Sequence, residues 1–572
     1  MRAFPAVFLS SFIVLAFACA REDTKNAEIL PDVFPGVKEV EGGINPNVLP
    51  VRDDTLRAYI LTPPAPAGPR VHGPKVYGER PGRPFQYRIP ATGDRPMTFS
   101  AEGLPRGLKL DAATGIITGT VRREGTWNAR VTATNDKGSD SRPLRIVIGD
   151  EIALTPPLGW NSWNCYASAV DQNKIAAAAK AMVDKGLADY GWSYVNIDDA
   201  WQGIRGGKHN AIQGNAKFPD MDGLSRYVHA KGLKLGIYSS PWTITYAGHI
   251  GSSADNADGT YERIKAGICD DTYRVTRYMN EEDSLKFATP SRVWRFFGHS
   301  FVKNDAAQWA DWGIDYLKYD WGPMDPVSAK EMADALHECG RDIVFSISNS
   351  AFLGNGPLWR EFVNCWRSTG DIVNTWESVS HIGFNLQERW APYVRTGHWA
   401  DADMLEVGNG GLTADEEYSH VSLWALLSSP MMIGCDLSKI GDFTLSLLTN
   451  GEVLDINQDA LGIPATKIEE EKGEFAIYEK NLEDGSVAVG LFNLTSKPRT
   501  LGFVPYLLGV YIDGVTVRDL WRQEDVARLE DKWDRWETKV APHGVVLVKV
   551  SPGYTLGTEI VLEKIIILIY II

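Results

Sequence analysis

The middle of the chain alternates between two patterns of hydrophobic and polar positions. Between about residues 155 and 437, short apolar runs that predict strands are followed by segments with helical spacing, such as 223–231 and 306–312. Each apolar run stops on polar residues, and eight such strand ends can be counted: 158–160, 194–199, 233–238, 316–320, 343–348, 365–371, 398–404 and 431–436. Eight parallel βα units close a (β/α)8 barrel, whose functional side chains lie at the carboxyl ends of the strands. We therefore expect an α/β fold with such a barrel over residues 150–465.

The strand predicted for residues 313–320 has the most informative end. It stops on Lys318 and Asp320, which lie two positions apart and therefore point to the same side of a strand. A cation and a carboxylate placed together in this way are typical of a catalytic site. We expect the other strand ends to bring their polar side chains to the same place.

On both sides of this region the pattern changes to a period of two, which predicts antiparallel β-sandwiches. Residues 71–149 contain short alternating runs separated by turn residues, and residues 103–120 resemble the immunoglobulin-like domains that are common in bacterial surface proteins. We interpret this N-terminal domain as a spacer without a ligand of its own. A C-terminal β-sandwich is predicted over residues 466–552.

The first residues predict an export signal of bacterial type over residues 1–19. Arg2 precedes an apolar run that is too short for a comfortable transmembrane helix. Residues 15–19 resemble a lipoprotein processing site, in which Cys19 would carry a lipid anchor, and the alternative is plain cleavage near residues 18–20. We expect an exported protein of the periplasm or cell surface that meets a membrane only through this anchor.

Two further segments lie outside the predicted domains. Residues 20–70 are polar and rich in proline, which predicts a linker. The apolar tail 553–572 is too short to span a bilayer. It is interpreted either as an additional buried strand or as a non-native extension of the gene.

Composition narrows the class of partner. The formal net charge of -15, without a sustained basic run, argues against nucleic acid and anionic membranes as partners, because both would repel the chain. The six cysteines are widely spaced and include no Cys-x-x-Cys pair, so neither a zinc site nor a dense disulfide framework is indicated. A neutral substrate fits this composition. No metal or other cofactor is indicated, and the oligomeric state is left open.

Two of the strand-end aspartates suit the cleavage of a glycosidic bond. Cleavage with retention takes a nucleophile and a proton donor, two carboxyl groups about 5 to 5.5 Å apart, and we predict Asp320 and Asp371 for these roles. Lys318 would keep Asp320 ionised, because its charge favours the carboxylate. Asp371 ends the sixth strand, where an apolar wall would raise its pKa toward that of a general acid. The alternative for any aspartate at a strand end is a cap or turn residue, since aspartate favours helix N-caps.

Several motifs in a fixed order resemble a known family. They are Thr155-Pro156-Pro157-Leu158-Gly159-Trp160-Asn161-Ser162-Trp163, Asn196-Ile197-Asp198-Asp199, Asp315-Tyr316-Leu317-Lys318-Tyr319-Asp320, Trp366-Arg367 with Asp371, and His398-Trp399-Ala400-Asp401-Ala402-Asp403-Met404-Leu405 with Gly408-Asn409. From about residue 155 to 550 the chain resembles the α-galactosidases (melibiases) of glycoside hydrolase family 27. These are retaining hydrolases on a (β/α)8 barrel with a C-terminal β-sandwich. The resemblance implies a carbohydrate substrate with a terminal α-galactosyl group and no cofactor.

The resemblance also implies a role for each site residue. Asp320 would be the nucleophile and Asp371 the acid/base. The sugar would be bound by Trp160 on its ring face, Asp198 and Asp199 at the 4- and 6-hydroxyls, Lys318 at the 3- and 4-hydroxyls, and by Tyr238, Arg367 and Asp403. Two fixed carboxylates at the axial 4-hydroxyl would reject the glucose epimer, which leaves them unpaired. The alternatives are a helix-capping role for Asp199 and a plain core position for Trp160.

The chain departs from the family pattern at two places. After the fifth strand, where α-galactosidases resemble Cys-Glu-Trp, it has Ser346-Ile347-Ser348-Asn349-Ser350-Ala351. In the family this region faces the 2-substituent of the sugar, so Ser348 is a further predicted substrate-binding residue. Small Ser348 and Ala351 resemble the α-N-acetylgalactosaminidases, in which small residues make room for an acetamide, whereas Asn349 fits neither pattern. The other departure is an insertion of about sixty residues after Tyr238, whose aromatic side chains serve extra sugar subsites or their own packing.

These departures leave three functional hypotheses. The first is an α-galactosidase that releases terminal galactose. The second is an α-N-acetylgalactosaminidase or a β-L-arabinopyranosidase of the same family. The third is a non-catalytic glycan-binding protein on a degenerate barrel, against which the retention of every named carboxylate argues.

Overall fold

The computed structural model describes residues 32–40, 53–254, 256–260 and 299–552. Between residues 264 and 295 it also describes the backbone of four short strands, β16 (Ile264–Lys265), β17 (Ile268–Cys269), β18 (Val275–Tyr278) and β19 (Arg292–Arg295). The predicted export signal, Cys19 and the apolar tail 553–572 lie outside the described residues, as do Tyr261, Tyr273 and Phe296 of the insertion. None of the helices in this part of the chain combines the length and the apolar character needed to cross a membrane.

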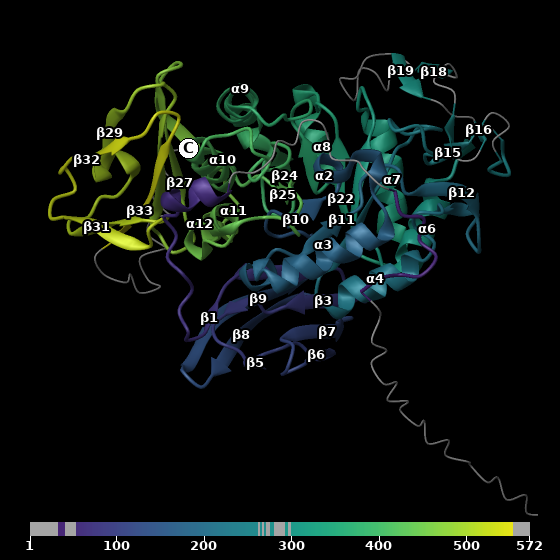
Figure 1. Cartoon of the computed structure of the whole chain (residues 1–572), viewed down its shortest axis with the longest axis horizontal. Coiled ribbons are helices and arrows are strands. Elements are labelled where there is room, and N and C mark those ends of the chain that lie inside the picture. The colour runs from purple at the N-terminus through teal and green to yellow at the C-terminus, as the bar shows by residue number, and fades with distance from the viewer. Residues whose placement is uncertain are drawn as a thin grey trace, which may run out of the picture. The chain divides into compact units, whose positions relative to one another are not determined.

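Eight parallel strands form the central sheet (Figure 1). They are β10 (Leu158–Asn161), β11 (Tyr194–Asn196), β14 (Lys234–Ser239), β21 (Tyr316–Asp320), β22 (Val344–Ser348), β23 (Cys365–Arg367), β24 (Trp399–Asp401) and β25 (Met431–Ile433). Neighbours in this series pair along the sheet from β10 to β24, and β25 returns to pair with β10. Leu405, just after β24, forms a parallel bridge to Ile433 in β25, which closes the ring. The predicted barrel and its eight strands are confirmed.

Helices alternate with these strands and cover the barrel (Figure 1). The main ones are α3 (Gln172–Asp184), α4 (Met221–Ala230), α6 (Val302–Trp312), α7 (Pro326–Glu338), α8 (Gly356–Phe362), α10 (Ala414–Leu426), α11 (Asp442–Leu448) and α12 (Gly451–Asn457), with shorter α2 (Trp163–Tyr166) and α9 (Trp376–Ser380). The short helix α1 (Asp53–Leu56) precedes the N-terminal strands. Aspartate caps fix several of the starts, because a carboxylate accepts from an otherwise unpaired N–H of the first turn. Asp171 accepts from the N–H of Lys174 at 2.9 Å, and Asp325 accepts from that of Ser328 at 2.8 Å.

The N-terminal region from β1 (Arg70–Val71) to β9 is a β-sandwich. One sheet has the order β2 (Val76–Glu79), β9 (Gly138–Ile148), β8 (Gly125–Asn135), β5 (Thr98–Glu102), and the other has β3 (Pro84–Arg88), β7 (Ile116–Thr120), β6 (Leu108–Leu110). Alternate apolar side chains of both sheets, among them Phe85, Ile117 and Ile146, are buried in one core. The period-two pattern therefore predicted this region correctly.

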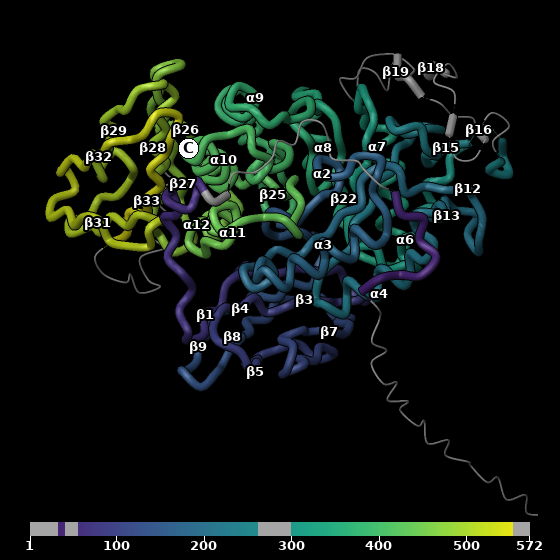
Figure 2. Tube along the Cα trace, viewed as in Figure 1, coloured from purple at the N-terminus to yellow at the C-terminus, as the bar shows by residue number. Residues whose placement is uncertain are grey.

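This sandwich contacts the amino-terminal ends of the barrel strands (Figure 2). Gln86 Nε2 donates to the carbonyl of Leu233, just before β14, at 2.8 Å. The N–H of Arg80 donates to Asp342, two residues before β22, at 2.6 Å, and their side chains form an ion pair at 3.1 Å. The carboxyl ends of the strands, where a barrel places its functional groups, lie at the other end.

The C-terminal region is a second β-sandwich. Its large sheet has the order β26 (Thr466–Glu471), β27 (Phe475–Asn481), β28 (Val487–Asn493), β33 (Val545–Pro552), β30 (Val515–Asp519), β31 (Glu524–Leu529), and its small sheet pairs β29 (Arg499–Phe503) with β32 (Trp536–Val540). The core includes Leu491, Val517 and Val548. Helix α10 is buried between this sandwich and the barrel, and Ser422 in that helix accepts from Trp521 Nε1 at 2.9 Å. The predicted C-terminal sandwich is confirmed.

Candidate active site

A cavity of about 320 Å³ lies at the carboxyl ends of the barrel strands. Eight of the ten residues predicted for the site line it: Asp198, Asp199, Tyr238, Lys318, Asp320, Arg367, Asp371 and Asp403. Trp163, Tyr246 and Asn349 complete much of the wall. Five carboxylates and two cations face a space that is large enough for one sugar ring, within the usual range of ligand pockets of roughly 300–1,000 Å³. A polyol that can donate to many carboxylate oxygens suits such a lining.

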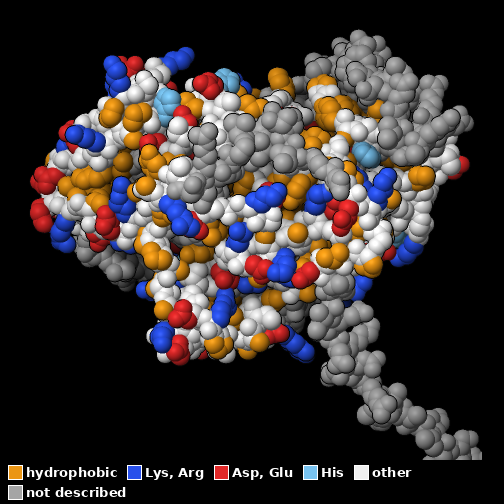
Figure 3. Space-filling view, in the orientation of Figure 1, with side chains coloured by type: hydrophobic (Ala, Val, Ile, Leu, Met, Phe, Trp, Pro, Cys, Tyr) orange, Lys and Arg blue, Asp and Glu red, His pale blue; other side chains and the backbone are white. Residues whose placement is uncertain are grey.

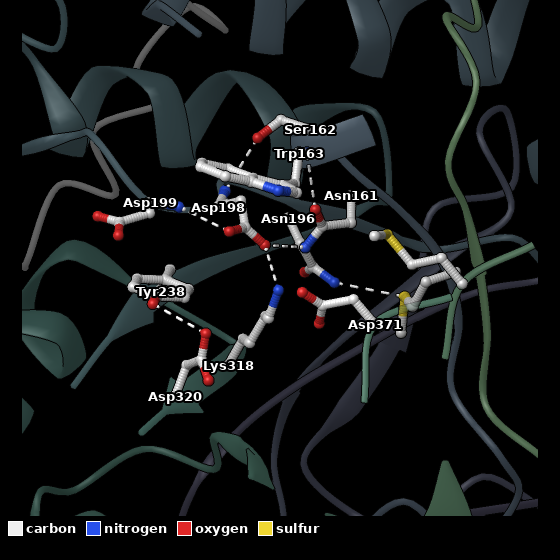
Figure 4. A network of polar contacts seen from close by, with 12 residues as sticks. Asn161, Ser162, Trp163, Asn196, Asp198, Asp199, Tyr238, Lys318, Asp320 and Asp371 are labelled. Carbon is white, nitrogen blue, oxygen red and sulfur yellow. Dashed lines mark hydrogen bonds and ion pairs between the residues drawn. The ribbon is translucent and has the colours of Figure 1, made fainter. Parts of the chain in front are cut away.

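Asp320 is held at both of its carboxylate oxygens. Tyr238 donates to Oδ2 at 3.0 Å (Figure 4), and Asn349 Nδ2 donates to Oδ1 at 3.1 Å. The side chain is buried, and burial raises the pKa of Asp320 to about 7, against the lowering effects of the charges on Lys318 and Arg367. The predicted stabilisation by Lys318 is therefore present, but desolvation outweighs it.

Lys318 and Asp198 form a buried pair beside Asp320. Lys318 Nζ lies 2.8 Å from Asp198 Oδ2, and Asn161 Nδ2 donates to the same oxygen at 2.8 Å (Figure 4). Burial lowers the pKa of Lys318, but the carboxylates of Asp198 and Asp320 outweigh that effect and leave the pKa above its ordinary value. Lys318 thus stays charged, pairs directly with Asp198 and acts on Asp320 through its charge.

Asp199 is fixed by the segment that follows β14. Its Oδ1 accepts from the hydroxyl of Thr245 at 2.8 Å and its Oδ2 accepts from the N–H of Ala247 at 2.9 Å. Burial raises the pKa of Asp199 to about 6, although these hydrogen bonds act to lower it. Among the described helices none begins at this residue, so the alternative role of a helix cap does not apply here. Asp199 is a cavity residue.

Arg367 connects the remaining charged groups. Its guanidinium donates to Asn349 Oδ1 at 2.9 Å, lies 3.2 Å from Asp403 Oδ2, and pairs with Asp371. A chain of contacts therefore runs from Asp320 through Asn349 and Arg367 to Asp371. Asp403 is also held by the N–H of Ile372, which donates to it at 2.8 Å.

The structure corrects the predicted shift in the pKa of Asp371, because this carboxylate pairs with Arg367. An apolar wall was expected to raise it, but Asp371 is 76% exposed at its side chain and faces a guanidinium. Partial burial raises the pKa, and the charge and hydrogen bond of Arg367 more than offset this, so the pKa lies below its ordinary value. Because the carboxyl is mostly in water, Arg367 stabilises its charge only modestly.

Trp160 is a core residue, so the predicted sugar contact is wrong for this tryptophan. Its side chain is fully buried, its Nε1 donates to the carbonyl of Cys435 at 2.8 Å, and it does not line the cavity. Trp160 lies within β10, whereas Trp163 begins the helix after the strand and does line the cavity (Figure 4). Residues after a strand end form the mouth of a barrel, and this rule points to Trp163.

Ser348, which was predicted to bind the substrate, also lies outside the cavity. It is buried at the end of β22 and lines a separate small space inside the barrel together with Ser346 and Tyr316. The next residue, Asn349, lines the cavity instead and contacts both Asp320 and Arg367. Ala351 is buried and does not line the cavity. The small side chains that suggested room for an acetamide therefore lie away from the cavity wall.

Comparisons with known proteins agree with this geometry. Residues 155–266 and 295–459 match the family described as Alpha galactosidase A, and residues 472–550 match its C-terminal beta sandwich domain. Residues 69–149 match an Ig domain family. The chain is 35% identical over 431 residues to Alpha-galactosidase A of Cellvibrio japonicus, which covers 70% of this chain and 93% of that protein. The chain belongs to the α-galactosidase family.

Two solved structures show how far the likeness to this family extends. A Bacteroides fragilis chain with the provisional name alpha-galactosidase/melibiase superposes with a TM-score of 0.71 and 32% identity, covering 87% of this chain and 100% of that one. A β-L-arabinopyranosidase of glycoside hydrolase family 27 from Geobacillus stearothermophilus gives a TM-score of 0.56 and 26% identity, covering 71% and 98%. Within the α-galactosidase family, therefore, this fold carries more than one named activity.

We expect the Tyr238→Phe variant to shift the acid limb of the pH profile upward by about one pH unit. Tyr238 donates to Asp320 and so favours its ionised form, which means that losing this donor raises the pKa of Asp320. Asp320 is the predicted nucleophile and must be ionised in that role, so as the pH falls the activity would be lost at a higher pH than in the unmodified enzyme. The measurement is kcat/KM of an aryl galactoside against pH.

The control for this shift is Tyr194→Phe. Tyr194 is buried at the amino end of β11, at the other end of the barrel from the cavity. Its replacement should leave the acid limb in place. An unchanged limb in Tyr238→Phe, or a move to lower pH, would contradict the assigned hydrogen bond.

Proposed function

We propose that the protein is a retaining, exo-acting α-galactosidase that releases terminal α-linked galactose from oligosaccharides or polysaccharides. The observation that carries this proposal is one cavity that is lined by both Asp320 and Asp371, with Trp163 and the pair Lys318 and Asp198 on its wall. Two carboxylates of different surroundings, joined by a polar chain, suit a double displacement. Family membership supports the class of reaction.

In the first step Asp320 attacks the anomeric carbon. The bond from that carbon to the leaving oxygen breaks, Asp371 gives its proton to that oxygen, and a galactosyl ester forms on Asp320 with inverted configuration. In the second step Asp371 takes a proton from water, whose oxygen attacks the same carbon. The ester bond breaks, Asp320 regains its charge, and galactose leaves with its original configuration.

The two carboxyl groups need opposite charges at the start of this cycle. Burial raises the pKa of Asp320, while Lys318 and Arg367 act against burial and favour the ionised form that the first step needs. A sugar in the cavity removes water from Asp371, which is largely exposed when the cavity holds none, and desolvation raises the pKa of a carboxyl group. Substrate binding thus prepares Asp371 to carry the proton that it donates.

Galactose is favoured over its relatives by the cavity wall. Asp198 and Asp199 are both fixed by several hydrogen bonds, which suits recognition of an axial hydroxyl. Asn349, rather than a small residue, stands beside Asp320, so the room predicted for an acetamide does not open into the cavity. The likeness to a β-L-arabinopyranosidase makes that activity the second candidate, since its sugar differs from galactose only in lacking the exocyclic carbon.

A panel of aryl glycosides tests the proposal. We expect the α-galactoside to have the highest kcat/KM, the β-L-arabinopyranoside to be slower because it leaves a 6-hydroxyl partner unpaired, and the 2-acetamido α-galactoside to be slower by about tenfold or more. Initial rates of aryl release measure this order. Faster cleavage of the acetamido or arabinosyl substrate would identify the other activity, and no turnover of any member would support a glycan-binding protein.

We also infer that the protein is exported. The inference rests on the N-terminal segment, in which Arg2 precedes an apolar run and a lipoprotein-like sequence ending at Cys19. In that setting the substrate would be a glycan met at the cell surface or in the periplasm.

A further inference from the structure

Three aromatic side chains are grouped at the outer end of the C-terminal sandwich. They are Tyr506, in the short helix η7 (Pro505–Leu508), Tyr511, and Trp533 in the loop between β31 and β32. The rings of Tyr506 and Trp533 stack with centroids 3.8 Å apart and 25° between their planes. Tyr511 meets Tyr506 edge to face at 5.2 Å. We call these three residues the aromatic platform.

The platform is open to solvent. Trp533 is 55% exposed and Tyr511 is 62% exposed, and Leu507 beside them is 70% exposed. Hydrophobic side chains gather at this outer edge of the sandwich, on the left of Figure 3. Large aromatic side chains usually contribute to a core, so a stack of them in water marks a binding surface.

Hydrogen bonds hold the platform in a fixed arrangement. The N–H of Trp533 donates to Asp531 Oδ1 at 2.9 Å, in a turn that also ties Asp534 to Asp531. The N–H of Tyr506 donates to the carbonyl of Lys532 at 3.0 Å, so the two loops that carry the stacked rings are joined directly. A ligand would therefore meet rings that are already oriented, which lowers the entropic cost of binding.

Polar groups that can bind hydroxyls surround these rings. Lys532 Nζ pairs with Asp513 Oδ1 at 3.1 Å, and Asp513 is 57% exposed at its side chain. Asp531 and Asp534 are exposed in the same turn as Trp533. Arg535, which follows this turn, is paired with Glu537, so the carboxylates around the rings outnumber the cations and disfavour an anionic ligand such as an acidic lipid surface.

We propose that the aromatic platform is a carbohydrate-binding site, distinct from the active-site cavity, for neutral pyranose units of a polysaccharide. The C–H groups on one face of a pyranose are weakly positive and attract the negative face of an aromatic ring, while its hydroxyls reach the polar rim. None of the platform residues lines the cavity. The site would hold a polymer on the enzyme while the cavity cleaves its terminal units, and only this last step depends on the proposed function.

Binding and turnover measured separately test this site. In the full chain carrying Asp320→Asn, affinity electrophoresis in galactomannan should show binding that Trp533→Ala and Tyr511→Ala each weaken by about tenfold. In the otherwise unmodified enzyme the same substitutions should lower the rate on dilute galactomannan and leave kcat/KM for an aryl α-galactoside unchanged. Trp533→Tyr, which keeps a ring, should retain most of the binding, and Tyr59→Ala, at an exposed tyrosine outside the platform, should retain all of it.

Two results would overturn the site. One is galactomannan binding that Trp533→Ala and Tyr511→Ala leave unaltered. The other is a change in oligomeric state in these variants, seen by light scattering, with binding unaltered, which would assign the platform to contact between copies of the chain. Failure of the proposed function is distinguishable, because it would appear as absent turnover of the aryl α-galactoside by the unmodified enzyme.

Discussion

The Asp320→Asn variant is expected to lose kcat by about 10⁴-fold or more on every α-galactoside. The amide has nearly the same shape, and its oxygen can still accept from Asn349 while its nitrogen faces the hydroxyl oxygen of Tyr238, but it cannot form the ester on which the double displacement depends. Folding and binding of galactose should therefore persist while turnover is lost. Stopped assays with aryl and disaccharide substrates, together with calorimetric binding of galactose, measure the two effects.

Chemical rescue makes the assignment of Asp320 specific. In Asp320→Gly, azide can occupy the space of the carboxylate and attack an activated α-galactoside from the same side, so the product should be the β-galactosyl azide. Asp436→Asn is the matched control, because Asp436 also follows a barrel strand but lies outside the cavity and pairs with Lys439. Full activity in Asp320→Asn, or an α-azide from Asp320→Gly, would show that another group is the nucleophile.

The Asp371→Ala variant is expected to lose activity according to the leaving group. An alkyl or sugar leaving group needs a proton, so kcat/KM should fall by about 10²–10⁴-fold, whereas a dinitrophenyl leaving group departs without one and should be affected little. The second step also lacks its base, so the galactosyl ester should accumulate and lower KM. Leaving-group series and mass spectrometry of the trapped enzyme measure these effects.

Azide distinguishes the two carboxylates once more. In Asp371→Ala it would replace the water of the second step and attack the ester on Asp320 from the opposite face, which gives the α-galactosyl azide. Equal losses for good and poor leaving groups would contradict the role of Asp371. Asp436→Asn again serves as the control that should retain activity.

The fold was accessible from the sequence because its signals are periodic. Apolar runs that end on polar residues marked all eight barrel strands, and period-two runs marked both sandwiches. The same rule brought Asp198, Lys318, Asp320 and Asp371 to one cavity, since parallel strands end at one edge. A fold can be predicted from such periodic patterns even when the end of each strand is known only to within a few residues.

The predictions that the structure corrects concern single side chains, whose positions depend on the exact residue at which a strand ends. Ser348 and Asn349 are neighbours, and one residue decides whether a side chain at the end of a strand points into the barrel or into the cavity. Trp160 and Trp163 stand on either side of the end of β10 for the same reason. The pKa of Asp371 depends on where the Arg367 guanidinium turns, which no sequence pattern records.

Tyr246 shows a further limit of the sequence. It belongs to the insertion, which has no counterpart in the motifs, yet it lines the cavity with its ring 54% exposed and packs edge to face on Trp242. Its role on the cavity wall follows only from the path of the chain after β14.

In the proposed mechanism, the guanidinium of Arg367 would couple the change in role of one carboxylate to that of the other. It faces Asp371 directly and Asp320 through Asn349, so the charge on Asp320 competes for it. When the galactosyl ester forms, Asp320 becomes neutral and that competition ends. The charge of Arg367 then stabilises the Asp371 carboxylate more strongly, which lowers the pKa of Asp371. Asp371, which has just given up its proton, would therefore stay ionised and act as the base for the attacking water. In this way one cation shared by two carboxylates would link formation of the ester on Asp320 to a lower pKa of Asp371.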